Sequence, residues 1–162
     1  MPSMPDVMDR IVAELVGALV ARGRPEVYRH HALVGTAAWD ECCGQLTAAP
    51  ERIFRYTVFP EEETGASACD VAELAVNVVV RLVRCVATAT DAGEPPPQEE
   101  VESTNREVMV DASIILNALV DPDWCEWWER AGISQTFVGE LGGCVEVETR
   151  FVLGLGVHTW SV

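Results

Sequence analysis

The sequence has no lysine and few basic residues of any kind. Its 11 basic residues are all arginines, and they face 26 aspartates and glutamates, which gives a formal net charge of -15 at pH 7. A surface with that charge repels the phosphates of nucleic acids and of anionic lipids. We therefore expect neither a specific grip on nucleic acid nor adhesion to a membrane, although DNA could slide past such a surface.

Long apolar runs are missing as well. No stretch reaches the roughly 18 to 20 uninterrupted apolar residues that span a bilayer. The N-terminus does not have the pattern of a signal peptide, because Asp6, Asp9 and Glu14 interrupt its apolar run and no basic segment precedes it. We expect a protein that is made in the cytosol and stays outside membranes.

The sequence also lacks the common catalytic motifs. There is no Gly-x-Ser-x-Gly elbow, and the glycines at Gly139, Gly142 and Gly143 lack the spacing and the lysine of a phosphate-binding loop. His30 and His31 are adjacent, so in an extended chain they point to opposite faces, and His158 is isolated. We expect no enzyme activity and no cofactor.

The cysteines do not follow a metal-binding pattern. They form no Cys-x-x-Cys pair and no repeated ligand spacing, which makes zinc improbable. Buried free thiols are the expectation, and one or two disulfides are the alternative in an oxidising environment. The six are Cys42, Cys43, Cys69, Cys85, Cys125 and Cys144.

What is present fits one globular domain over residues 1–162. The hydrophobic content is 49% and the charged content 23%, both ordinary for a folded protein. A chain of this size buries roughly 68–70% of its unfolded surface, which is enough for a stable core without disulfides or a bound metal. There is no internal repeat, and the proline-rich segment is too short to separate two cores.

Two long helices are predicted. The first begins at a capping box between Ser3 and Asp6, and Gly23 followed by Pro25 ends it. The second covers Gln98 to Val120, with Glu99 and Glu100 complementing the positive end of the helix. Their apolar stripes consist of Val7, Met8, Ile11, Val12, Leu15, Val16 and Leu19 in the first helix and Val101, Val108, Ala112, Ile115, Leu116 and Leu119 in the second.

Strands are predicted between and after the helices. An extended segment covers Val27 to Val34, and alternation of aromatic and polar residues predicts a strand from Arg52 to Phe59. A valine-rich strand from Leu74 to Val86 turns its apolar side chains to one face. Arg81 and Asn77 lie on the other face, which would meet solvent or a neighbouring subunit.

The last part of the chain is expected to hold a short helix and a strand. Asp121 and Pro122 would cap a short helix that Gly132 ends. From Val145 to Leu153, apolar residues alternate with charged ones in an amphipathic strand. The order of elements predicts an α+β fold with a mainly antiparallel sheet, flanked by the N-terminal helix and the second long helix.

Two clusters of residues are candidates for function. The tryptophans of the short helix would stack together and either pack on the sheet or form a subunit interface, in which tryptophan is enriched; they are Trp124, Trp127 and Trp128. The triplet Glu61, Glu62 and Glu63 lacks the spaced ligands of a calcium loop and is expected to be a solvated acidic loop.

Several segments together resemble a known family. Ala38 to Leu46 is AWDECCGQL, and an arginine-rich aromatic strand and a prolyl turn at residues 59–60 follow it. Arg81 to Val86 is RLVRCV, Asp91 to Pro97 holds an aspartate, a glycine and three prolines, and Gly142 to Val145 is GGCV. In this order the segments resemble head-to-tail connector proteins of actinobacterial phages. The chain differs from that pattern in a polar turn at residues 46–52 and a last strand that continues to residue 162.

The resemblance implies a structural role. Proteins of that family are tail terminators, which cap the finished tail tube as a ring, commonly a hexamer, and present a surface to the head. The implied partners are further copies of the chain, the tail tube protein and head-completion or other neck proteins, with genomic DNA as passing cargo. The implied location is the head–tail junction of the virion, after assembly in the host cytoplasm.

A ring through which DNA passes needs a lumen that does not trap phosphate. We expect carboxylates to line it, either Glu146 and Glu148 or the loop of Glu61, Glu62 and Glu63. The alternatives are another neck component, such as a head-completion or stopper protein, and a small cytosolic ligand-binding domain with Trp124, Trp127 and Trp128 around a pocket.

Overall fold

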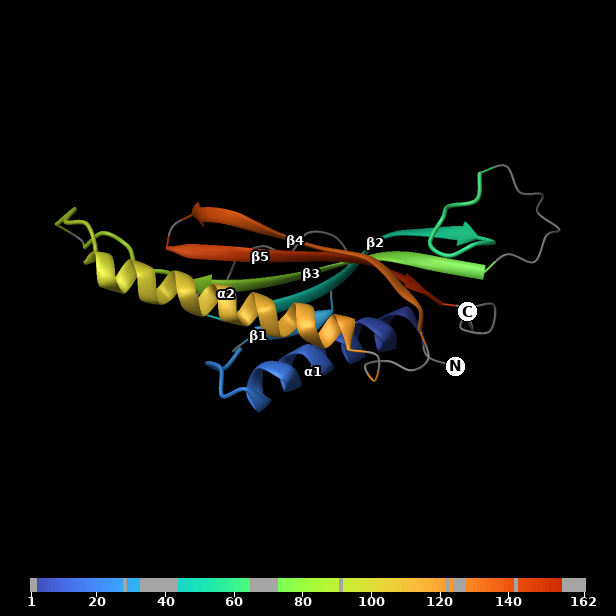
Figure 1. Ribbon diagram of the computed structural model, residues 1–162, viewed down its shortest axis with the longest axis horizontal. Helices are drawn as coiled ribbons and strands as arrows, with labels where there is room; N and C mark the ends of the chain where they lie inside the picture. Colours follow the sequence, from blue (N-terminus) through green and yellow to red (C-terminus); the bar gives the residue numbers. More distant parts are fainter. Residues whose placement is uncertain are drawn as a thin grey trace.

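The computed structural model describes residues 3–27, 29–32, 44–64, 73–90, 92–121, 123, 128–141 and 143–155. Figure 1 shows long strands in one twisted sheet, with both helices on the same side of it. In chain order the elements are α1 Met4–Ala21, β1 Arg29–Ala32, β2 Gln45–Tyr56, β3 Glu73–Cys85, α2 Gln98–Val120, β4 Arg130–Leu141 and β5 Cys144–Gly154.

The strand order is β1-β2-β3-β5-β4, with β1 parallel to β2 and every other described pair antiparallel. This confirms the predicted α+β fold with a mainly antiparallel sheet. Helix α2 connects β3 to β4, and β4 then turns back through β5 into the position beside β3. The helix therefore crosses from the middle of the sheet to its edge strand.

Helix α1 begins as the sequence predicts. The Ser3 backbone N–H donates to the Asp6 carboxylate at 2.7 Å, and the Asp6 N–H donates back to the Ser3 hydroxyl at 3.4 Å. The Ser3 hydroxyl also donates to the Asp6 carboxylate at 2.6 Å, and this bond, followed by the one from the Ser3 backbone N–H, lowers the pKa of Asp6. Gly23, with φ of +65°, follows the last turn in the left-handed conformation that favours glycine.

Helix α2 has the predicted bounds, but its two halves differ in burial. Its buried side chains begin only at Val108 and continue to Leu119. The preceding ten residues, 98–107, contain no fully buried side chain. The amphipathic stripe therefore continues at Val101 beyond the part of the helix that the core covers.

Strand β2 is longer than predicted and contains an irregularity. The expected polar turn at residues 46–52 is wrong, because these residues belong to β2 and pair with β3. The register shifts between Pro50 and Arg52, so one extra residue changes the side to which later side chains point. Leu46 therefore faces the helices, whereas Phe54 faces the opposite side and packs with Tyr56.

Strand β4 was not predicted, and the expected helix end at Gly132 is wrong. Gly132 lies inside β4 with φ of +61°, next to a register shift between Ala131 and Ser134. The alternation in this strand is weak, because the polar Gln135 faces α2, whereas the apolar Val138 is exposed. Period-two reasoning has little to detect in such a strand.

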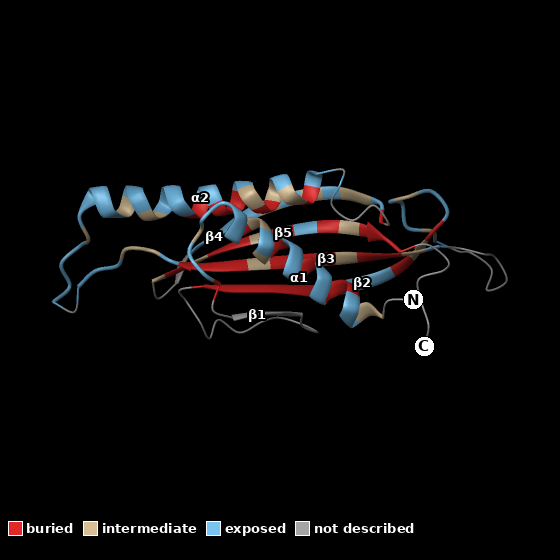
Figure 2. Cartoon of the chain, turned by 90° about the horizontal axis from the view of Figure 1, so that it is seen from below, coloured by how far each residue is buried: buried red, intermediate tan, exposed pale blue. Residues whose placement is uncertain are grey.

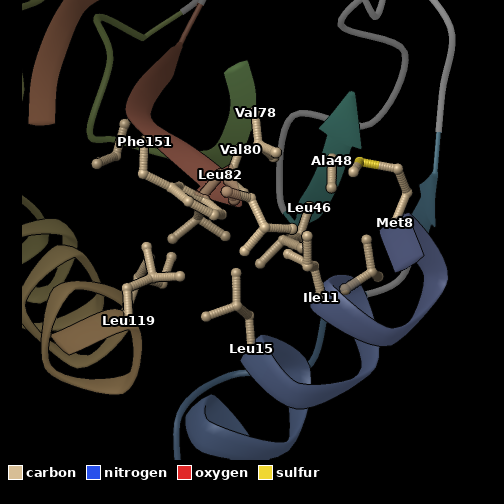
Figure 3. Close-up of a cluster of buried hydrophobic side chains, with 14 of the residues drawn as sticks. Met8, Ile11, Leu15, Leu46, Ala48, Val78, Val80, Leu82, Leu119 and Phe151 are labelled. Atoms are coloured by element: carbon tan, nitrogen blue, oxygen red, sulfur yellow. The ribbon is translucent and has the colours of Figure 1, made fainter. Parts of the chain in front are cut away.

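The main core lies between the sheet and the two helices. Met8 and Ile11 of α1 lie beside Ala48 and Leu46 of β2, whereas Leu15 lies nearer to Leu119 of α2 (Figure 3). Full burial of each such side chain contributes about 1.5–3 kcal/mol relative to leaving it exposed. The predicted apolar stripes of α1 and α2 therefore meet over one face of the sheet.

In Figure 2 both helices lie in front of the sheet, and Figure 1 shows that no helix of the described residues lies on the opposite face. A small apolar cluster occupies its end near the close of β2, where the rings of Tyr56 and Phe59 meet edge to face at 5.4 Å between centroids. Elsewhere this face holds polar and charged side chains of β3 and β5, together with the buried Val79 and Val83 of β3. We call it the helix-free face.

Candidate interaction surfaces

Charged side chains form a ladder on the helix-free face. Arg81 of β3 lies 3.2 Å from Glu146 and 3.0 Å from Glu148 of β5. Arg150 donates to Glu148 at 2.7 Å and reaches across to Glu51 of β2 at 2.6 Å. The ladder thus joins three strands and contains three carboxylates and two guanidinium groups.

Burial falls along the ladder. The side chains of Glu146 and Arg81 are 7% and 12% exposed, whereas that of Arg150 is 46% exposed. Burial by itself raises the pKa of Glu148, but the hydrogen bond from Arg150 and the charges of Arg150 and Arg81 outweigh it and lower that pKa below 4.5. The same hydrogen bond raises the pKa of Arg150. Both groups are therefore held in their charged forms.

A second ion cluster lies under the helices. The carboxylate of Asp111 on α2 is 1% exposed and pairs with Arg24, which follows α1, and with Arg84 of β3 at 2.8 Å. Arg84 also donates to the backbone carbonyls of Pro25 and Glu26 at 3.0 and 3.2 Å. This triad ties both helices and the sheet together, and its burial assigns it a structural role.

The predicted channel carboxylates lie in two separate places. Glu146 and Glu148 belong to the ladder, where arginines accompany them. Residues 61–63 follow the cis Phe59–Pro60 turn beyond the end of β2, and the side chain of Glu62 pairs there with Arg52. Glu61 is exposed. The acidic loop therefore lies in a different region from the ladder, and its Glu63 is half-buried.

The three candidate tryptophans divide between described and undescribed positions. Trp128 is 8% exposed and belongs to the main core, with the Arg10 guanidinium 5.8 Å from its ring centroid. Packing, rather than an interface, therefore describes Trp128. Trp124 and Trp127 lie outside the described residues, and for them the interface remains a prediction.

Trp128 also borders an open, mostly polar hollow of about 720 Å³. Tyr56 and Glu73 line the same hollow, and the Tyr56 hydroxyl donates to the Glu73 carboxylate at 2.5 Å. One of the three tryptophans therefore borders a hollow, as the ligand-binding alternative requires. The hollow is a wide surface depression rather than an enclosed cavity.

The cysteines correct one expectation. Cys85 and Cys144 are disulfide-bonded, so the expectation of free thiols is wrong for these two. They lie opposite each other in the register of β3 and β5, on the helix-free face. The other four cysteines fall outside the described residues. Within the described part of the chain, no group of three His, Cys, Asp or Glu side chains could hold a metal ion.

An apolar groove lies at the end of the sheet where α2 begins, and the sequence did not predict it. It has a volume of about 470 Å³ and opens between the first half of α2 and strand β4. Met109 and Phe137 on its two walls are 57% and 53% exposed. The remaining lining residues are Val86, Ala87, Val101, Thr104, Asn105, Val108, Val138, Gly139 and Val145.

One signal for this groove was available in the sequence. The apolar stripe of the second helix begins at Val101, a full two turns before its first fully buried residue, Val108. The opposite wall, with Phe137 and Val138, belongs to the strand that the sequence reasoning missed. Only the pairing of β4 with β5 brings the two walls together.

None of the helices in the described part of the chain is long and apolar enough to cross a membrane. No known protein family matches this chain, and no curated protein sequence is significantly similar to it.

Proposed function

We propose that this chain is a structural virion protein, a tail terminator that caps the tail tube of a tailed phage and joins it to the head. It acts as a homo-oligomeric ring, a hexamer, around an acidic passage for DNA. Its partners are copies of itself, the tail tube protein and head-completion or other neck proteins. Its place is the head–tail junction of the virion.

The observation that carries the proposal is the division of the sheet into two unlike faces. One face bears both helices and the core, and the other presents a ladder of three carboxylates and two arginines. A ring subunit needs a rigid element with a surface that does not retain DNA. A sheet that helices stiffen on one side, in a chain of net charge -15, is consistent with that need.

The order of the motifs supports the same proposal. Of the segments that carry the resemblance, Arg81 to Cys85 belong to β3, and Gly143, with φ of +83°, makes the turn into β5. The proline-containing connection precedes α2 in the expected position.

Within this proposal the loop of Glu61, Glu62 and Glu63 is the better candidate for the channel. The ladder carboxylates are paired with Arg81 and Arg150, which reduces the field that passing DNA would meet. Neutralising the loop with the Glu61→Gln and Glu63→Gln changes should slow genome passage and leave assembly intact. Unchanged ejection kinetics would contradict the acidic channel.

The experiment that tests the ring is native mass spectrometry with negative-stain imaging of the purified chain, alone and with tail tubes. Rings that cap tube ends would support the terminator. A chain that stays monomeric and ignores the tubes would contradict it and favour another neck component. Imaging with the tubes present controls for a ring that closes only on its template.

A further inference from the structure

We propose that the groove between α2 and β4 is a docking site for an extended, basic and apolar segment of another protein, which adds to β4 as a further strand. The inference concerns a single copy of the chain and is independent of ring formation. Three features of the described residues support it: the apolar walls, the open edge of β4 and the acidic rim of α2.

The walls of the groove are apolar and too exposed to be explained by packing within the chain. Met109, Phe137 and Val138 are 57%, 53% and 39% exposed, and they lie around one hollow of about 470 Å³. Exposed apolar side chains that gather in one place mark interaction sites more often than scattered ones do. Alternate side chains of an extended segment would fill this volume.

The edge of the sheet provides the backbone partner. Strand β4 is the last strand of the described sheet, and its pairing within that sheet is with β5 alone. An edge strand directs every second N–H and C=O group away from the sheet, which is the template for an added strand. In Figure 2 helix α2 lies along the β4 side of the sheet, and residues of both elements line the groove, so a strand added at this edge would lie next to the helix.

The glutamates on the first half of α2 favour a basic ligand. Between Gln98 and Met109 the helix carries four glutamates, Glu99, Glu100, Glu102 and Glu107, and one arginine, Arg106. Glu102 flanks the apolar stripe on one side and Glu100 on the other. Glu107 instead pairs with Arg24 at 3.6 Å and faces away from the groove. A basic segment complements this rim, whereas a second copy of a chain with net charge -15 would be repelled.

Gly139 makes the groove testable. A Cβ added at this position meets no atom within 4 Å, and its backbone does not adopt a positive φ. The Gly139→Leu change should therefore fill the groove from the β4 wall without disturbing the fold. Gly17 on α1, where an added Cβ also meets nothing within 4 Å, offers Gly17→Leu as the matched control.

The probe is a fluorescent peptide of about eight residues, the length of an ordinary strand, with alternating valine and lysine. Its anisotropy is measured with the full chain and both variants. We expect the Gly139→Leu change to weaken binding by roughly tenfold or more, and the Gly17→Leu change to leave it unaltered. Peptides that alternate valine with glutamate, or serine with lysine, should bind at least roughly tenfold more weakly than the probe.

Three outcomes would overturn the inference. The first is equal binding of the probe to the wild type and to the Gly139→Leu variant, and the second is equal binding of the serine–lysine peptide, which would show unspecific charge attraction. The third is self-association of the wild type that Gly139→Leu abolishes in sedimentation velocity, because the groove would then be a contact between copies.

If Gly139→Leu does not fold, Met109→Lys at an exposed helical position replaces it and should weaken binding of the probe by the same factor. If the chain forms rings on tail tubes but does not bind the peptide, the docking proposal fails and the proposed function stands.

Discussion

Two ion clusters lie on opposite faces of the same sheet and are built from the same types of residue. Arg81 and Arg84 are three positions apart on β3, so their side chains leave the strand on opposite sides. Arg84 enters the triad with Asp111 and Arg24 beneath the helices. Arg81 enters the ladder with Glu146 and Glu148 on the helix-free face.

The two clusters differ in burial and therefore in what they can contribute. The Asp111 side chain is 1% exposed, whereas the ladder ends at Arg150, which is 46% exposed. A buried charge that loses its partner keeps its full desolvation cost, while an exposed one returns to water. The triad thus fixes the arrangement of the helices, and the ladder mainly sets the charge of a surface.

The largest effect is expected at the triad. Asp111→Ala removes the carboxylate between Arg24 and Arg84 and should lower the free energy of unfolding by about 3–5 kcal/mol, because two largely buried guanidinium groups lose their anion. Urea unfolding followed by circular dichroism measures this. Glu107→Ala is the control, since that side chain is 57% exposed and should cost less than about 1 kcal/mol. Equal losses of stability for the two changes would show that burial does not decide how much each carboxylate contributes.

A smaller effect is expected at the buried end of the ladder. Arg81→Met removes the cation that lies 3.2 Å from Glu146 and 3.0 Å from Glu148. The loss in unfolding free energy should be about 1–3 kcal/mol, because buried carboxylate oxygens lose a charged donor. Adding Glu146→Gln to this variant should recover part of the loss in a double-mutant cycle. Strict additivity of the two changes would show that the pair does not interact.

The ladder should also make stability depend on pH. The folded-state pKa of Glu148 lies below its ordinary value of 4.5, so its contribution is present above that pH and is lost as the pH falls through the folded pKa. Glu148→Gln should therefore be less stable than the wild type by about 1 kcal/mol near pH 7, and the difference should shrink as the pH falls below 4.5 and through the folded-state pKa. Urea unfolding over this pH range measures it. A constant difference at all pH values would exclude titration of Glu148 as the cause.

The smallest effect belongs to the exposed end. Arg150→Ala breaks the pairs with Glu148 and Glu51 at a side chain that is 46% exposed, and should cost about 0.2–1 kcal/mol. The difference from the wild type should shrink further in about 1 M salt, where charges are screened over a few ångströms. A loss of unfolding free energy as large as that of Arg81→Met would show that the contribution of a ladder residue does not depend on its exposure.

Local patterns in the sequence were sufficient for several elements. The capping box at Ser3, the stripe of α1, the bounds of α2 and the alternation of β5 were all predicted and are all present. Each depends on residues within one or two turns, or on neighbours along one strand. Strand β4 lacks such a local pattern, because glycines and Gln135 interrupt its alternation, and it went unpredicted.

The candidate sites show the same division. The acidic composition and the carboxylates of β5 were visible in the sequence, but their arginine partners were not. Arg24 and Asp111 are 87 positions apart, and Arg150 and Glu51 are 99 apart. No periodicity predicts such pairs, and the two walls of the groove are likewise joined only through the pairing of β4 with β5.

The sequence by itself determined the helices, the amphipathic strand, the α+β class and the acidic charge, because each follows from residue types and short spacings. Only the tertiary structure decided which arginine became buried, which carboxylates were paired, and where an apolar groove remained open. Strand register assigns each side chain to one face, and the bulge in β2 reverses that assignment within a single strand. Contacts between distant segments then decide whether a charge is a structural tie or part of a surface.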